Sequence, residues 1–123
     1  MLMEKYEPLT ETSFYILLCL SAGAGYGYNI MKMTGELSGG TLHLGPGTLY
    51  GALGKMQKKG WIVQTWQEES RKGYALTQEG GEGLDREIHR LEQMVVCART
   101  VASCKKEGTQ TAAWEDGEGT EPT

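Results

Sequence analysis

Apolar residues recur at helical spacing in two stretches near the start of the chain, which predicts two helices. Residues 10–21 open on Thr10, a residue type that caps helices, and are mostly apolar from Phe14 to Leu20. A glycine-rich break follows at residues 23–25. Residues 26–37 then form a second predicted helix, with an inner side made of Ile30, Met31, Met33 and Leu37.

A third helix is predicted from Pro46, whose fixed φ suits a first helical position, to the lysines before Gly60. Its apolar face consists of Leu49, Ala52, Leu53 and Met56. The other side carries Thr48, Tyr50, Gly51 and Lys55. Because Gly45 and Gly47 leave the first-turn amides uncovered, we expect this helix end to attract an anion such as phosphate.

Two runs rich in β-branched and aromatic residues, 61–66 and 73–77, predict a hairpin joined by the polar segment 67–72. Residues 41–44 alternate in polarity and predict one short strand before the third helix. The expected fold class is therefore mainly α with a small β-hairpin (α+β). Three helices followed by a hairpin are typical of a winged helix-turn-helix, in which the third helix enters the major groove of DNA.

A long fourth helix is predicted over residues 78–104, with Thr77 as its cap and three glycines that weaken its first turn. Apolar residues alternate along it at spacings of four and three, namely Leu84, Ile88, Leu91, Val95, Ala98 and Ala102, and Met94 and Val101 widen the stripe. A seam of this length needs a partner surface. We expect a homodimer formed through Leu84, Ile88, Leu91, Met94, Val95, Ala98 and Val101, and the alternative is a helix folded back on its own domain.

A chain of 123 residues closes one modest core. We predict a DNA-binding domain over residues 1–77, a dimerisation helix over 78–104, and a disordered acidic tail over 105–123. The net charge of −4 is unevenly distributed, because residues 41–77 alone are net positive, with five basic residues against two acidic ones. Since the local field decides where a polyanion docks, the acidic total does not exclude DNA.

Other classes of function find little support in the sequence. The longest apolar run, residues 14–20, is far shorter than the roughly 20 residues of a membrane span. Without a recognisable secretion signal we expect a cytoplasmic protein with three free thiols. His89 and Cys97 lie about 12 Å apart along a helix, too far to share a metal ion, so neither metal nor cofactor is expected. No nucleophile, base and acid arrangement indicates an enzyme.

Five motifs follow one another along the chain. They are Tyr26-Gly27-Tyr28-Asn29-Ile30, Leu37-Ser38-Gly39-Gly40, the run from Leu44 to Leu53, Lys59-Gly60-Trp61-Ile62 and Arg71-Lys72-Gly73-Tyr74-Ala75-Leu76-Thr77. In these motifs, over about residues 8–100, the chain closely resembles the PadR-like transcriptional regulators. The resemblance implies a homodimeric bacterial repressor that binds a pseudo-palindromic operator in double-stranded DNA and is released by a small-molecule effector.

We therefore predict that DNA is contacted by Tyr28, Gly47, Thr48, Tyr50, Gly51, Lys55, Arg71, Lys72 and Tyr74. Among these, Lys55, Arg71 and Lys72 are expected to bind phosphates rather than bases. The family wing commonly has Tyr and Arg where this chain has Gly73 and Ala75. Two alternatives remain open at this point: a merely solvated helix face, and an interaction adaptor that keeps the winged fold without binding DNA.

Overall fold

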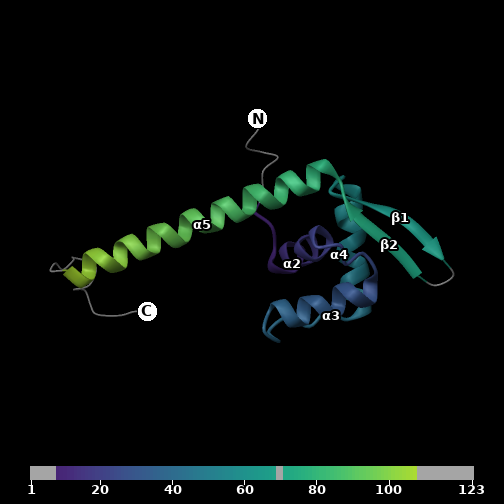
Figure 1. Cartoon of the computed structure of the whole chain (residues 1–123), viewed down its shortest axis with the longest axis horizontal. Coiled ribbons are helices and arrows are strands. Elements are labelled where there is room, and N and C mark those ends of the chain that lie inside the picture. Colours follow the sequence, from purple (N-terminus) through teal and green to yellow (C-terminus); the bar gives the residue numbers. More distant parts are fainter. Residues whose placement is uncertain (1–7, 69–70, 108–123) are drawn as a thin grey trace. The chain divides into compact units, whose positions relative to one another are not determined.

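The computed structural model describes residues 8–68 and 71–107, and Figure 1 shows the arrangement of their helices and strands. Its elements are α2 (Glu11–Ser21), α3 (Gly27–Leu37), α4 (Pro46–Lys58), β1 (Ile62–Glu68), β2 (Arg71–Leu76) and α5 (Gln78–Glu107). The chain divides into two compact units, Met1–Glu87 and Ile88–Thr123. The predicted class, a mainly helical winged fold with a small hairpin and a long C-terminal helix, is confirmed.

Helix α2 forms the centre of the core, as its sequence predicts. The Thr10 hydroxyl oxygen accepts a hydrogen bond from the Ser13 amide at 3.0 Å and caps the first turn. Ile16, Leu17, Cys19 and Leu20 are buried. On α3 the buried residues are Gly27, Ile30 and Thr34, whereas Leu37 is 47 % exposed, so its predicted place on the inner side is wrong. Thr34 tolerates burial because its hydroxyl donates to the Met31 carbonyl at 3.0 Å.

The short strand predicted at residues 41–44 does not form. Local hydrogen bonds to Ser38 hold this segment instead: the Thr41 hydroxyl donates to the Ser38 carbonyl at 2.9 Å, and the Leu42 amide donates to the Ser38 hydroxyl at 3.0 Å. Because a side chain and a turn satisfy these groups, the segment needs no strand partner. Leu44 nevertheless reaches the core and is only 9 % exposed.

Strands β1 and β2 pair antiparallel from Ile62 opposite Leu76 to Glu68 opposite Arg71. An irregularity between Gln64 and Trp66 interrupts the register. The strands extend further toward the tip than the sequence predicted, since residues 67–68 and 71–72 are paired rather than part of the loop. An isolated bridge between Gly73 of β2 and Tyr26, the N-cap of α3, fixes the hairpin to the helices.

Thr77 connects the end of α4, the hairpin and the start of α5. Its hydroxyl donates to the Gly60 carbonyl at 2.6 Å and accepts a hydrogen bond from the Gly80 amide at 3.0 Å, while its own amide donates to the Trp61 carbonyl at 2.9 Å. Gly80 lies so close to the Trp61 carbonyl that a β-carbon there would collide with it. This glycine is therefore required for packing, which the sequence reading of a weakened first turn missed.

Helix α5 runs unbroken over 30 residues, three residues beyond the predicted end at 104. Its first turns belong to the first unit, because the division between the two compact units falls after Glu87. Leu84 and Glu87 are buried, at 4 % and 3 % exposure. Leu84, predicted to be a dimerisation residue, is thus already buried within one chain, and its place in the seam stays a prediction. Residues 108–123 of the predicted tail lie outside the described residues.

Candidate nucleic-acid interface

One side of α4 is exposed and nearly free of bulky side chains. Gly47, Thr48, Gly51 and Lys55 are all exposed, while Leu49, Leu53 and Met56 on the other side are at most 1 % exposed. A β-carbon added at Gly47 or Gly51 would meet nothing within 4 Å. The predicted division of this helix into a buried apolar face and an open polar face is confirmed, and the open face lets another molecule approach the backbone closely.

The start of α4 strengthens the attraction of this face for anions. Gly45 is the N-cap and supplies no side-chain hydrogen bond to the helix, and Pro46 follows as the first helical residue. The Leu49 amide donates to the Gly45 carbonyl at 2.9 Å, so the amides of Gly47 and Thr48 precede the first helical hydrogen bond. These N–H groups carry the positive end of the helix dipole at the exposed surface.

Tyr50 lies at the edge of this face and also supports it. Its ring approaches the start of α3 so closely that a side chain at Gly27 would collide with the Tyr50 hydroxyl. The residue keeps 41 % of its surface exposed. Tyr50 therefore fixes the orientation of α4 against α3 while leaving part of its ring accessible.

The hairpin contributes two cations. Arg71 and Lys72 are exposed on β2, opposite Glu68 and Gln67. The Arg71 guanidinium carbon lies 5.7 Å from the centroid of the Tyr26 ring, a cation–π contact that restrains the side chain near the start of α3. Tyr28, the second residue of α3, is 70 % exposed.

Tyr74 is the exception among the predicted DNA contacts. It is 6 % exposed, and burial, followed by the nearby Tyr50 side chain, raises the pKa of its phenol. The Tyr74 amide donates to the Gly25 carbonyl at 3.0 Å, which ties β2 to the turn between α2 and α3. Tyr74 thus positions the hairpin from inside the domain, and its contact with DNA stays a prediction.

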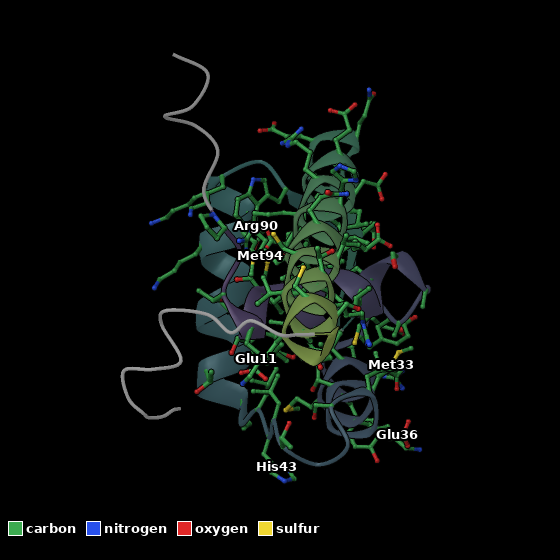
Figure 2. The ribbon with its side chains drawn as sticks, turned by 90° about the vertical axis from the view of Figure 1, so that its left-hand side faces the viewer. Glu11, Met33, Glu36, His43, Arg90 and Met94 are labelled. Atoms are coloured by element: carbon green, nitrogen blue, oxygen red, sulfur yellow. The ribbon has the colours of Figure 1, made fainter. Side chains whose placement is uncertain are left out.

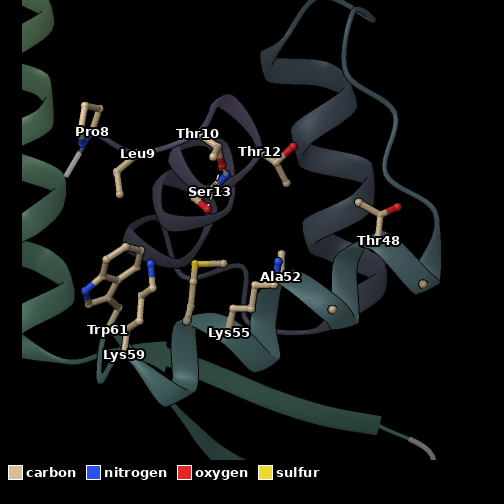
Figure 3. A pocket seen from close by; sticks show the side chains of 13 residues that line it. Pro8, Leu9, Thr10, Thr12, Ser13, Thr48, Ala52, Lys55, Lys59 and Trp61 are labelled. Atoms are coloured by element: carbon tan, nitrogen blue, oxygen red, sulfur yellow. Dashed lines mark hydrogen bonds between the residues drawn. The ribbon is translucent and has the colours of Figure 1, made fainter.

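A pocket of about 580 Å³ opens beside α4, and sequence reasoning did not find it. Thr12, Ser13, Lys59 and Trp61 line it together with part of the open α4 face (Figure 3). Lys59 Nζ lies 4.8 Å from the centroid of the Trp61 ring. The α2 contribution carries no periodic signal in the sequence, because only the fold brings its first turn next to α4.

A different surface occupies α5 in the second unit. Met94, Val95, Val96 and Val101 are each about half exposed, at 49–56 %, and Ala98 is exposed as well. The Arg90 guanidinium donates to the Met94 sulfur at 3.2 Å, one turn along the same helix (Figure 2). Ile88 and Leu91 are half-buried. Most of the predicted seam is therefore exposed apolar surface in a single chain.

Residues 8–68 and 71–107 contain neither a candidate metal site nor a candidate membrane-spanning helix. No group of three or more His, Cys, Asp or Glu side chains lies in an arrangement suited to a metal ion. None of the helices combines the length and the hydropathy that crossing a bilayer would require.

Comparison with known proteins gives one relative that is described as a regulator and one that is described only as uncharacterized. "Transcriptional regulator YqjI" of Escherichia coli K12 is 28 % identical over 102 residues, which are 81 % of this chain and 49 % of that protein. An uncharacterized 37.1 kDa protein in transposon TN4556 of Streptomyces fradiae is 34 % identical over 85 residues, which are 68 % of this chain and 24 % of that protein. The chain thus spans about half or less of the length of these relatives.

The fold matches as well. The crystal structure of a PadR family transcription regulator from Clostridium difficile superposes with a TM-score of 0.63 at 26 % identity, covering 76 % of this chain and 99 % of that one. The family model described as "Transcriptional regulator PadR-like family" matches residues 16–86, which include α3, α4 and the hairpin. These are transcriptional regulators and not enzymes. The chain belongs to the PadR-like family of transcriptional regulators.

Proposed function

We propose that this protein is a homodimeric repressor that binds a pseudo-palindromic operator in double-stranded DNA and is released from it by a small-molecule effector. The observation that carries the proposal is the exposed α4 face, where Gly47, Thr48 and Gly51 leave the helix almost bare. A helix with so little bulk on one side fits closely against base-pair edges in a major groove. The family assignment gives this face its expected ligand.

The cations around the bare face supply affinity for the DNA backbone. Lys55 lies on α4 itself, and Arg71 and Lys72 lie on the hairpin. Exposed cations of this kind neutralise phosphates and release counterions whatever the base sequence, so their contribution depends on salt. Sequence preference is then left to Thr48 and to the close approach allowed by Gly51.

The exposed apolar surface of α5 supports a homodimer. Met94, Val95 and Val101 are each about half exposed in one chain, and a second copy of the helix would remove them from water. Symmetric pairing also presents two α4 helices, which doubles the number of base pairs read. The pseudo-palindromic operator follows from that symmetry.

The experiment is a fluorescence-anisotropy titration of the purified protein with duplexes from the upstream region of its own gene and with scrambled duplexes, across a salt series. We expect tighter binding to the upstream duplex, with an affinity that falls steeply as salt rises. Light scattering on the same samples should give the mass of two chains. A single chain that binds no duplex at low ionic strength would contradict the proposal.

A second candidate function is an interaction adaptor that keeps the winged fold without binding DNA. Two observations favour it: the chain is net acidic at −4, and Tyr74 is buried rather than displayed on the hairpin. In that case the protein binds neither the upstream duplex nor the scrambled one, and the Lys72→Ala variant gives the same titration as the wild type.

A further inference from the structure

The pocket beside α4 has a composition that DNA contact alone does not explain. Its floor is apolar and is built by Met56, Ala52 and Trp61, with Leu9 and Pro8 on the α2 side. Its volume of about 580 Å³ lies within the roughly 300–1,000 Å³ that small-ligand sites occupy.

Polar groups converge on one part of this apolar pocket. Lys55 and Lys59 are one helical turn apart, and Figure 3 shows both side chains extending from α4 toward α2. Lys59 is additionally placed over the Trp61 ring, at 4.8 Å from its centroid. The hydroxyls of Thr10 and Ser13, 3.0 Å apart, lie across from the two lysines. The pocket therefore combines an apolar floor with two cations and hydrogen-bonding groups.

We propose that this pocket binds a small organic anion with a flat or aliphatic apolar body, and that an occupied pocket excludes DNA from α4. The anionic group lies between Lys55 and Lys59, and the apolar body covers Met56 and Ala52. Since Gly47, Thr48, Gly51 and Lys55 belong both to the pocket and to the face assigned to DNA, the two ligands compete for the same atoms. The competition with DNA rests on the proposed function.

The mechanism of release is then direct. A ligand seated against Gly51 occupies the space into which a Cβ would point, and that space is free in the protein alone. Its negative charge also cancels the attraction of Lys55 for a phosphate. No movement between the units of the chain is needed.

The experiment uses the full chain and the fluorescent probe 1-anilinonaphthalene-8-sulfonate, an aromatic body with one sulfonate. Leu9→Trp fills the pocket, and we expect at least a tenfold loss of probe affinity. Lys59→Gln removes an exposed cation without changing the core, and we expect about a fivefold loss. Leu37→Trp is the matched control, because Leu37 is 47 % exposed on α3 and does not line the pocket. Its affinity should equal that of the wild type.

Competition with DNA is measured on the same samples. Addition of the upstream duplex should displace the probe from the wild type, and the probe should raise the apparent dissociation constant of the duplex in proportion to its concentration. Probe affinities within twofold of wild type in both pocket variants would overturn the site. If the duplex binds but leaves the probe in place, competition is overturned while DNA binding stands. If no duplex binds, the proposed function fails and the probe series alone decides the site.

Discussion

Helices α4 and α5 both have several glycines near their beginnings, but the surroundings of those glycines differ. A β-carbon at Gly47, Gly51 or Gly54 of α4 would meet nothing within 4 Å, whereas one at Gly80 of α5 would collide with the Trp61 backbone. Gly80 is thus explained by packing inside the chain. The α4 glycines have no such internal reason, although each costs up to about 1 kcal/mol relative to Ala in a helix interior. Their open surface therefore suggests a partner outside the chain.

The apolar residues of the two helices are distributed in the opposite way. The large apolar residues of α4, namely Leu49, Leu53 and Met56, are buried within the domain. On α5 the apolar residue Leu84 is buried, but Met94, Val95 and Val101 are about half exposed. One helix thus exposes backbone and cations, which suit a polyanion, and the other exposes hydrocarbon, which suits a second copy.

The largest expected effect comes from charging the α5 seam. Val95→Glu places a carboxylate in the proposed dimer interface, where desolvation of the charge opposes association. We expect a single chain by light scattering and about a hundredfold weaker binding to the upstream duplex, because each molecule then reads one half-site. Gln93→Glu, an exposed position away from the seam, should keep both properties. If the Val95→Glu variant dimerises as strongly as the wild type, the exposed apolar residues of α5 do not form the dimer interface.

The next effect tests the bare face of α4. Gly51→Ala adds a methyl group into open space, so the free energy of unfolding should rise by about 0.5–1 kcal/mol in a urea titration. Binding to the upstream duplex should nevertheless fall about tenfold, because the methyl group occupies the path of the DNA. Gly81→Ala, also in open space but on α5, should be stabilised similarly and keep its affinity. Equal DNA affinity in the two variants would show that Gly51 is merely solvated.

A matched pair at the start of α5 tests the internal explanation of its glycine. Gly80→Ala forces a methyl group against the Trp61 carbonyl, and we expect a loss of about 1–3 kcal/mol in the free energy of unfolding. Gly81→Ala meets nothing within 4 Å and should stabilise the helix slightly. Chemical denaturation followed by circular dichroism gives both values. Similar stabilities would mean that the close approach at Gly80 is not maintained in solution.

In the proposed complex Lys72 contacts a phosphate and not a base, so Lys72→Ala tests the part of the affinity that does not depend on base sequence. We expect a several-fold loss of affinity for all duplexes alike, and a plot of log affinity against log salt that is shallower by about 1. The upstream and the scrambled duplex are measured in parallel. A changed ratio of the two affinities would contradict a phosphate contact at Lys72.

The smallest effect concerns the thiols. Burial raises the pKa of the Cys19 thiol from its usual 9.0 to about 11, while Cys97 and Cys104 are exposed on α5. Ellman's reagent at pH 8 should therefore titrate two thiols quickly and the third only on unfolding. Since the folded state holds the Cys19 proton more tightly, stability should fall as the pH rises from about 9 to about 11. Three fast thiols would contradict the buried position.

Sequence patterns predicted α2 and α4 well, because both helices bury apolar residues at helical spacing and begin with a recognisable residue, Thr10 or Pro46. The same periodicity predicted the open face of α4, because the small and polar residues lie on the side opposite the apolar ones. The strand expected at residues 41–44 was wrong, because Ser38 takes up the hydrogen bonds that a strand would have offered. Alternation over four residues does not distinguish these two outcomes.

Contacts between distant segments account for the remaining differences. Tyr74 is in a basic motif that suggests exposure, but its amide bonds to Gly25, and its ring is buried. In the sequence Gly80 is a residue that weakens the first turn of the helix. The structure shows that the Trp61 carbonyl leaves no room for a side chain at this position. The pocket combines the first turn of α2 with the end of α4, two segments more than thirty residues apart in the chain. No local pattern encodes such proximity.

The hydrogen bonds of Thr77 have a mechanical consequence. Through one side chain and one amide, this residue holds the last turn after α4, the first residue before β1 and the first turn of α5. Because Thr77 bonds both segments directly, a rotation of that first turn about the helix axis would also displace the root of the hairpin. A movement at the base of α5 would therefore reach the point where α4 ends and the hairpin begins.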